Sequence, residues 1–359
     1  FMSQTISIDG RLVGPGAPAY IIAEMSANHH HDFDRAVDIL RAAKEAGADA
    51  IKLQTYRPET MTLDAPQDHF RVAGGTLWDG RSLYDLYAEA HTPWEWQPRL
   101  KKLASDLGLH LFSTPFDASA VDFLEAMNVP AYKIASFELV DLPLIEKVAR
   151  TGKPIILSTG MGNLEEIGEA VQAARSAGAS ELVLLKCTSA YPSLPEDANL
   201  RTIQHLAATF GVPAGLSDHT MGIAVPVAAV ALGACVVEKH FTLSRAIPGP
   251  DSTFSLEPHE FKEMVNAIRV AEKALGQVRY GSGDLEKPSQ VFRRSLFVVR
   301  DMKAGEAFTA DNVRCIRPGN GLAPKHLGAI LGHRASRDIK RGTPLAWELI
   351  VGADARDAA

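Results

Sequence analysis

Two histidines close two neighbouring apolar segments of the sequence. Residues 213–219 read PAGLSDH, and residues 235–241 read CVVEKHF. Because alternate residues of a strand share a face, Glu238 and His240 point one way and Lys239 points the other way. Two imidazoles from adjacent strand ends, near carboxylates, predict a divalent-metal site at His219 and His240 that leaves positions open for substrate and water. We expect Glu238 to tune the imidazoles or a bound water, and Lys239 to serve the scaffold.

A second group of residues has the chemistry of an anion site. Lys52 and Lys133 stand inside apolar runs, where charged side chains are rarely buried without a partner. Lysines supply charge, and hydroxyls with backbone N–H groups complete a cradle for phosphate or carboxylate. The alternative is that the lysines turn outward or pair with Glu24 and Glu138. The hydroxyls that end the neighbouring runs are Ser113, Thr114, Ser136, Ser158, Ser189 and Ser217.

These residues all end segments of one repeating pattern. Short β-rich runs alternate with amphipathic stretches, in which apolar residues recur at positions i, i+3, i+4 and i+7, as in a helix. Glycines such as Gly47 and Gly178 follow these stretches, as helix C-caps do. The predicted strands lie at residues 19–27, 50–56, 109–115, 131–136, 154–160, 182–189, 213–219 and 235–241.

Eight strands that alternate with helices predict a (β/α)8 barrel, the TIM-barrel architecture, whose active site lies at the carboxyl ends of the strands. A doubly wound open sheet is the alternative, but the GxGxxG fingerprint is missing after the first predicted strand. Residues 57–92 interrupt the pattern after the second strand and are rich in glycine, aspartate and aromatic residues. Long loops in compact domains are often functional, so we expect this insert on the catalytic face.

The last part of the chain departs from the barrel pattern. Residues 276–290, GQVRYGSGDLEKPSQ, are polar and rich in turn-forming residues, which predicts a linker. Beyond them, short strand-like runs are separated by turns such as KAGE and KRGT. We therefore predict a barrel domain over residues 1–275, a linker over 276–290 and a small second domain over 291–351.

Composition limits the classes of protein to consider. The 359 residues are 46% hydrophobic and 22% charged, as in a soluble globular protein with a sizeable core. A net charge of -6 argues against a nucleic-acid partner. An apolar run of about 18 residues and a signal-peptide pattern are both missing, so we expect no membrane partner and a cytoplasmic location. Three widely spaced cysteines, Cys187, Cys235 and Cys315, indicate a reducing compartment and no structural zinc cluster.

Ordered motifs along nearly the whole chain resemble the sialic acid synthase family. They are IIAEMSANH, KLQTY, STPF, AYKIAS, ILSTGM, KCTSAYP, GLSDHT, EKHF, GPDSTFSLEP and RPGNG. Enzymes of this family are transferases that condense phosphoenolpyruvate with an N-acetylated amino sugar to give a nonulosonic acid. The resemblance also implies an antifreeze-like (SAF) C-terminal domain. Within the family, AEMSANH and GTLWDGRSLYDLYAEAHTPWEW resemble the pseudaminic acid branch, and the neuraminic and legionaminic branches are the alternatives.

The resemblance implies a role for each candidate site residue. His219 and His240 correspond to metal ligands, usually for Mn²⁺, with Mg²⁺ or Co²⁺ as alternatives. Arg317, in the RPGNG motif, corresponds to an arginine that holds the N-acetyl group in the partner subunit's active site, which implies a domain-swapped homodimer. The sugar-side positions are Glu24, Tyr191 and Asp251. The phosphoenolpyruvate-binding positions are Lys52, Thr114, Lys133, Ser136, Ser158, Ser189 and Ser217.

The reaction that the resemblance implies joins phosphoenolpyruvate to 2,4-diacetamido-2,4,6-trideoxy-L-altrose and releases phosphate by C–O cleavage. We expect Glu138 to activate the attacking water, Glu24 to orient the sugar, and the lysines to stabilise the charge of phosphoenolpyruvate. Two other classes share part of the pattern. A metal-dependent pyruvate aldolase would share the barrel and the histidines but would release no phosphate. A sugar-binding or ice-binding protein would need only the small domain and has no use for an open metal position.

Overall fold

The computed structural model describes residues 5–353, so residues 1–4 of the predicted barrel domain lie outside the described residues. The chain divides into two compact units, Phe1–Gly276 and Gln277–Ala359. In the first unit, eight parallel strands close into a barrel in the order β10-β3-β4-β5-β6-β7-β8-β9. Because β10 pairs with β3, the sheet has no free edge, which confirms the (β/α)8 barrel and excludes the open sheet.

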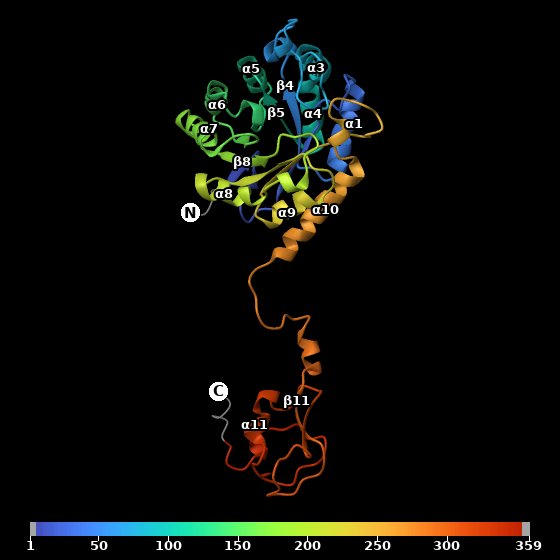
Figure 1. Cartoon of the computed structure of the whole chain (residues 1–359), viewed down its shortest axis with the longest axis vertical. Helices are drawn as coiled ribbons and strands as arrows, with labels where there is room; N and C mark the ends of the chain where they lie inside the picture. Colours follow the sequence, from blue (N-terminus) through green and yellow to red (C-terminus); the bar gives the residue numbers. More distant parts are fainter. Residues whose placement is uncertain (1–4, 354–359) are drawn as a thin grey trace. The chain divides into compact units, whose positions relative to one another are not determined.

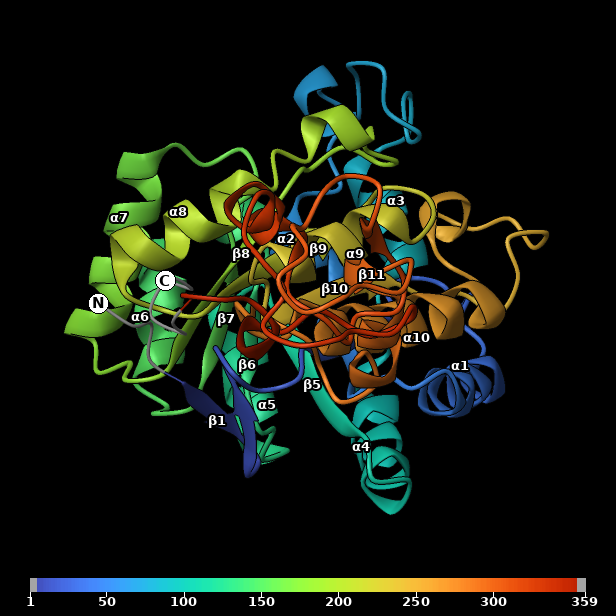
Figure 2. The same ribbon diagram turned by 90° about the horizontal axis from the view of Figure 1, so that it is seen from below.

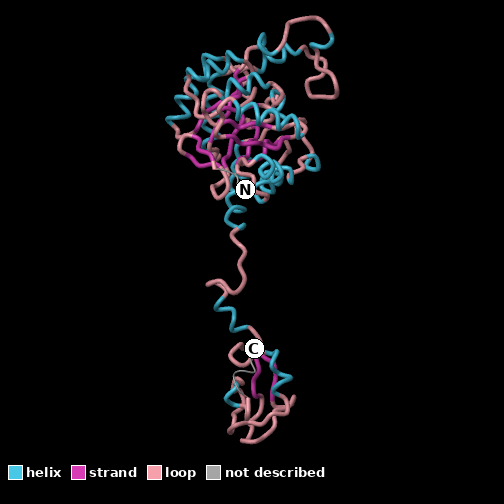
Figure 3. The backbone as a smooth tube through the Cα atoms, turned by 90° about the vertical axis from the view of Figure 1, so that its left-hand side faces the viewer, coloured by secondary structure: helices cyan, strands magenta, loops and turns pink. Residues whose placement is uncertain are grey.

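The barrel strands fall where the sequence predicts them. Their backbone and side chains are buried on both faces, which is why they read as nearly continuous apolar runs. Figure 3 shows these strands at the centre of the first unit, with the helices outside them. The strands are β3 Tyr20–Glu24, β4 Ala50–Thr55, β5 His110–Pro115, β6 Tyr132–Ile134, β7 Ile155–Ser158, β8 Leu182–Cys187, β9 Ala214–Asp218 and β10 Val236–His240.

Amphipathic helices follow the strands and cover the outside of the barrel, as two views at right angles show (Figures 1 and 2). Several of them start with side-chain caps: Asp32 accepts from the backbone of Asp34 and Arg35, and Asn163 forms a capping box with Glu166. The helices are α1 Phe33–Glu45, α4 Gln97–Asp106, α5 Ala118–Ala126, α6 Leu142–Ala149, α7 Leu164–Ser176, α8 Arg201–Phe210, α9 Ala224–Ala231 and α10 Pro258–Leu275. Short 3₁₀ helices in the loops are η2 Trp94–Trp96, η3 Ser136–Glu138, η4 Pro195–Asp197 and η5 Ser252–Phe254.

An antiparallel hairpin precedes the barrel and is absent from the sequence prediction. It joins β1 Ile6–Ile8 to β2 Arg11–Val13, and its turn residues, Asp9 and Gly10, both have positive φ, as an Asp-Gly hairpin turn requires. The backbone N–H of Ser7 donates to Glu181 at 2.7 Å, and Arg11 pairs with Asp49. Since Asp49 and Glu181 precede strands β4 and β8, the hairpin packs at the amino ends of the strands.

The predicted insert at residues 57–92 is partly ordered into short elements. It holds helices α2 Pro58–Met61 and α3 Leu83–Ala90 and the 3₁₀ helix η1 Asp68–Phe70. A bridge between Arg71 and Ser82 folds the middle of the segment back on itself. The insert is therefore a folded segment that follows the carboxyl end of β4.

The second unit has a core of its own, built around residues such as Leu296, Phe308 and Ile330. Strands β11 Ser295–Val298 and β12 Val313–Ile316 pair antiparallel. Its short helical elements are η6 Lys287–Phe292, η7 Pro324–His326, α11 Leu327–Ile330 and η8 Trp347–Leu349. In neither unit does a helix within residues 5–353 have the length and hydropathy to cross a membrane.

Candidate active site

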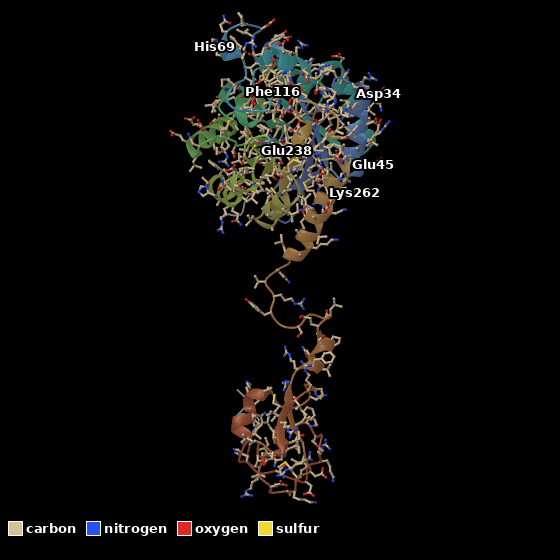
Figure 4. The ribbon with its side chains drawn as sticks, turned by 45° about the vertical axis from the view of Figure 1, so that its right-hand side comes forward. Asp34, Glu45, His69, Phe116, Glu238 and Lys262 are labelled. Atoms are coloured by element: carbon tan, nitrogen blue, oxygen red, sulfur yellow. The ribbon has the colours of Figure 1, made fainter. Side chains whose placement is uncertain are left out.

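A cavity of about 400 Å³ opens at the carboxyl ends of the barrel strands. Figure 4 labels Glu238 in the interior of the first unit and His69, from the insert, at its edge. A second hollow of about 450 Å³ lies at the amino ends, beside His110 and Lys153, and contains none of the predicted site residues. The predicted residues that line the first cavity are Lys52, Lys133, Ser136, Glu138, Ser158, Tyr191, Ser217, His219, Glu238, His240 and Asp251.

Strand register builds a buried ion cluster at the base of this cavity. Glu24 on β3 lies beside Lys52 on β4, and β10 brings Glu238 to the other side of β3. The Nζ atom of Lys52 lies 2.6 Å from Glu24 Oε2 and 3.1 Å from Glu238 Oε1, and Lys133 Nζ lies 3.7 Å from Glu238 Oε1. The sequence left open that the lysines pair with Glu24 and Glu138. Lys52 does pair with Glu24, but the carboxylate that Lys52 and Lys133 share is that of Glu238.

Burial and charge compete within the cluster. Burial alone would lower the pKa of Lys52, but Glu238 and Glu24 outweigh it and raise that pKa. Burial raises the pKa of Glu24 despite the opposing effect of Lys52. For Glu238, burial raises the pKa, but Lys133 and Lys52 together bring it below its usual value. Glu238 also accepts from Ser217 Oγ at 3.4 Å, and its predicted effect on the imidazoles stays a prediction.

Hydroxyls line the side of the cavity formed by β6, β7 and β8. Ser136 Oγ accepts from the Gly160 backbone at 3.0 Å. A Cβ atom at Gly160 would lie 2.3 Å from Ser189 Oγ and 2.6 Å from Ser136 Oγ, so only glycine lets the backbone approach both hydroxyls. The buried Oγ of Ser158 has no hydrogen-bond partner within residues 5–353. A buried polar atom of this kind needs a water or a ligand, which makes this wall a candidate anion cradle.

Three of the predicted site residues lie behind the residues that line the cavity. The expectation for a fourth residue, Ser113, is wrong. Thr114 accepts from Lys52 Nζ at 3.3 Å, Glu24 pairs with the same nitrogen, and Ser189 lies beside Gly160. Ser113, expected in the cradle, is instead hydrogen-bonded to Thr55 Oγ1 at 2.6 Å. Adjacent strand residues face opposite sides, so Thr114 and Ser113 cannot both point into the barrel.

The two histidines lie together as predicted, with ring centroids 5.3 Å apart. His219 Nδ1 lies 2.8 Å from the Thr188 carbonyl oxygen, so Nδ1 carries the hydrogen and the Nε2 lone pair stays available. The buried Nδ1 of His240 has no hydrogen-bond partner in the described part of the chain, and burial lowers the pKa of His240 well below its usual value. Burial alone would lower the pKa of His219, but Cys187 and the Thr188 carbonyl outweigh it and raise that pKa. Once both imidazoles are unprotonated, their lone pairs fit a divalent metal. Within residues 5–353 no group of three His, Cys, Asp or Glu side chains could hold a metal, so water or substrate would complete the coordination.

Lys239 has the scaffold position that strand alternation predicts. Its side chain is fully buried, and its Nζ atom lies 2.5 Å from Asp218 Oδ2 on β9. It also donates to the backbone carbonyl of Thr220. The VVEKH strand therefore directs Glu238 and His240 to the cavity and Lys239 to an ion pair in the barrel wall.

Of the other predicted site residues, three line the cavity and one, Arg317, lies in the second unit. Burial raises the pKa of Glu138 to about 7, and its Oε2 atom is buried without a partner. Asp251 accepts from Ser26, and burial raises its pKa. The ring centroid of Tyr191 lies 4.3 Å from that of His219. Arg317 is exposed in the second unit, directly after β12, and its role in a partner subunit stays a prediction.

Several residues that line the cavity receive no role from the sequence: Gln54, Tyr56, Trp78, Phe116 and Cys187. A role for Gln54 could have been inferred, because it lies two residues after Lys52 on β4 and therefore shares its face. Trp78 comes from the insert, which has no periodic pattern from which its direction could be read.

Comparisons with known proteins give the same overall architecture and family. The NeuB family model matches residues 39–280, and the SAF domain model matches residues 293–351. Pseudaminic acid synthase of Helicobacter pylori is 49% identical over 331 residues, covering 92% of this chain and 97% of that protein. Pseudaminic acid synthase of Campylobacter jejuni is 46% identical, covering 91% and 95%. The crystal structure of N-acetylneuraminic acid synthetase from Leptospira borgpetersenii, in complex with citrate, is 32% identical, with a TM-score of 0.72 over 80% of this chain and 95% of that one.

Proposed function

The chain belongs to the NeuB family, and from this premise we propose that it is a pseudaminic acid synthase. The reaction condenses phosphoenolpyruvate with 2,4-diacetamido-2,4,6-trideoxy-L-altrose to give pseudaminic acid and phosphate, which makes the protein a transferase. The observation that carries the phosphoenolpyruvate part is the buried pair of lysines beside an unpartnered serine hydroxyl at the base of the cavity. The identity to two pseudaminic acid synthases supports the choice of sugar.

Phosphoenolpyruvate carries a carboxylate and a phosphate, and both need positive charge and hydrogen-bond donors. Lys52 and Lys133 supply charge already fixed in place by Glu24 and Glu238, so little reorganisation accompanies binding. The hydroxyls of Ser136, Ser158, Ser189, Ser217 and Thr114 would complete the cradle. Ser158 contributes most to this argument, because its buried hydroxyl has no hydrogen-bond partner among the residues that the structure describes.

His219 and His240 would hold a divalent metal, with Mn²⁺ as our first choice and Mg²⁺ or Co²⁺ as alternatives. Such an ion supplies Lewis-acid polarisation of the sugar aldehyde and fixes its orientation. Burial favours the neutral form of His240, and the Thr188 carbonyl fixes the His219 tautomer. Tyr191 and Asp251 line the side of the cavity where we place the sugar, and Glu24 would act on the sugar from behind the lining, where it pairs with Lys52.

In the proposed reaction, C3 of phosphoenolpyruvate bonds to the aldehyde carbon, and the aldehyde oxygen becomes a hydroxyl. Positive charge develops at C2, where water then adds and gives up a proton. Glu138 is placed to accept that proton, because its carboxyl lines the cavity and has a pKa of about 7, which suits a base at neutral pH. Cleavage of the C2–O bond releases phosphate and leaves the 2-keto acid.

The proposal includes two further expectations, one about the assembly and one about the location in the cell. The first is a domain-swapped homodimer, in which Arg317 of one chain would hold the N-acetyl group of the sugar in the partner's cavity. The second is a cytoplasmic location. The exposed guanidinium of Arg317 in the second unit is compatible with a contact made outside its own chain.

A coupled assay of phosphate release tests the function directly. Enzyme, Mn²⁺ and phosphoenolpyruvate are incubated in parallel with the diacetamido altrose, with N-acetylmannosamine and with the legionaminic acid precursor. The proposal expects the altrose derivative to give the largest kcat/KM. A larger value for either other sugar would assign the chain to a neighbouring branch of the family. Product formation from pyruvate without phosphate release would indicate the aldolase instead.

A further inference from the structure

The cavity has two chemically different sides. Its base carries the ion cluster of Lys52, Lys133 and Glu238. The opposite side comes from the insert at residues 57–92 and is mainly apolar. Tyr87 and Ala90 of the insert also line this side, and we call its large apolar side chains the insert wall: Met61, Val72, Trp78, Leu83 and Leu86.

Specific contacts hold the insert wall beside the sugar side of the cavity. Trp78 Nε1 donates to the Pro250 carbonyl at 3.0 Å, and the Trp78 ring lies 5.6 Å from the Tyr191 ring between centroids. Asp251, next in sequence to Pro250, accepts from Ser26. The single hydrogen-bonding group of the Trp78 side chain is therefore used for anchoring, and the ring presents apolar surface to the cavity.

Backbone hydrogen bonds also fix the position of Val72. Its N–H donates to the Arg81 carbonyl at 2.9 Å, and its carbonyl accepts from the Gly80 N–H at 2.8 Å. Val72, Met61 and Leu83 are each half-buried, as expected for side chains that line a cavity. The insert wall is thus a folded surface that a ligand would contact directly.

The two sides of the cavity suit different substrates, because the base is charged and the insert wall is apolar. Both charged groups of phosphoenolpyruvate find their partners at the base of the cavity, which leaves the insert wall to the distal part of the aldose. A hydroxyl placed against these apolar side chains loses water and gains no hydrogen bond from them, which is unfavourable. A methyl group in the same place gains from burial of its apolar surface.

We propose that the insert wall is the specificity element that selects a deoxygenated, N-acylated aldose over one with free hydroxyls on its distal carbons. This inference rests on the proposed function and deepens it by naming the residues that set the sugar preference. An apolar pocket discriminates by about 10- to 100-fold against an analogue that adds a hydroxyl. We expect a preference of this size for the trideoxy sugar in the wild-type protein.

Two nearly isosteric substitutions test the insert wall, Val72→Thr and Met61→Gln. Each adds a hydrogen-bonding group with little change in volume, and Val72→Thr keeps the β-branched shape. The matched control is Leu63→Asn, which changes an exposed residue of the same insert that does not line the cavity. Calorimetry with Mn²⁺ present and phosphoenolpyruvate absent measures the dissociation constants of the trideoxy diacetamido sugar and of N-acetylmannosamine.

The inference expects the ratio of the two dissociation constants to fall about 10-fold in Val72→Thr or Met61→Gln, and to stay at the wild-type value in Leu63→Asn. Equal affinities in the wild-type protein would overturn it, as would ratios that no wall variant alters or that Leu63→Asn alters equally. Phosphate release is measured separately. A wild-type protein that prefers the trideoxy sugar in binding, yet releases no phosphate, would refute the proposed function and leave the insert wall intact.

Discussion

Replacing Lys52 with methionine removes the cation that two buried carboxylates share. The side chains of Lys52, Glu24 and Glu238 are each at most 5% exposed, and Lys52 Nζ lies 2.6 and 3.1 Å from the two carboxylates. At an effective dielectric constant of about 20, each contact is worth roughly 5–6 kcal/mol before desolvation. Desolvation of the ammonium group offsets much of this attraction. Loss of one partner from a buried ion pair typically costs about 3–5 kcal/mol, which is the loss we expect in the free energy of unfolding.

The loss of stability in Lys52→Met should depend on pH in a defined direction. Lys52 lowers the pKa of both carboxylates, so its removal raises their pKa values in the folded protein. The folded variant then binds protons more tightly than its unfolded chain does. Its stability therefore rises as the pH falls through the raised pKa values of the two carboxylates, and the deficit relative to the wild type shrinks.

Urea unfolding followed by tryptophan fluorescence measures this difference. Lys133→Met, at a lysine 3.7 Å from Glu238, should lose less stability than Lys52→Met. Lys102→Met is the exposed control, because Lys102 forms an exposed pair with Asp106 one helical turn away, and it should lose at most about 0.5 kcal/mol. If Lys52→Met unfolds with the same free energy as Lys102→Met, the buried cluster does not exist in the form described.

Three further substitutions test the remaining roles. Glu138→Gln should lower kcat by about 10²- to 10⁴-fold. It should also remove the acid limb of the pH–rate profile near pH 7, since the wild-type carboxylate must be unprotonated to accept a proton. A variant that keeps the wild-type profile would contradict this role. His240→Ala should abolish Mn²⁺ binding in calorimetry while the melting temperature stays close to that of the wild type, and full activity of EDTA-treated wild-type enzyme would argue against the metal. Arg317→Ala should raise the KM for the sugar without changing the KM for phosphoenolpyruvate, and unaltered kinetics would dismiss the capping contact.

The barrel could be predicted because its signals are local. Each strand is a short apolar run, and each cap, such as Asp32 before α1, lies within a few residues of the helix that it stabilises. Strand alternation also separated Glu238 and His240 from Lys239, and the ion pair of Lys239 with Asp218 confirms that separation. The Asp-Gly turn of the first hairpin was an equally local signal that the sequence prediction overlooked.

The contacts that cross the barrel could not be read from sequence. The contact between Lys52 and Glu238 depends on the pairing of β10 with β3 and of β3 with β4, that is, on where the barrel closes. The position of Trp78 depends on its hydrogen bond to Pro250, which lies 172 residues away in the chain. Both are products of tertiary packing between distant segments, and this packing decides which residues surround the substrates.

The fate of the bridging oxygen of phosphoenolpyruvate tests the central claim most directly. The wild-type enzyme is supplied with Mn²⁺, the diacetamido altrose and phosphoenolpyruvate labelled with ¹⁸O between C2 and phosphorus. Mass spectrometry of both products then locates the label. The account predicts that the released phosphate carries the label and that the nonulosonic acid does not. Label in the sugar acid, or a product formed without phosphate release, would contradict a condensation that proceeds by C–O cleavage.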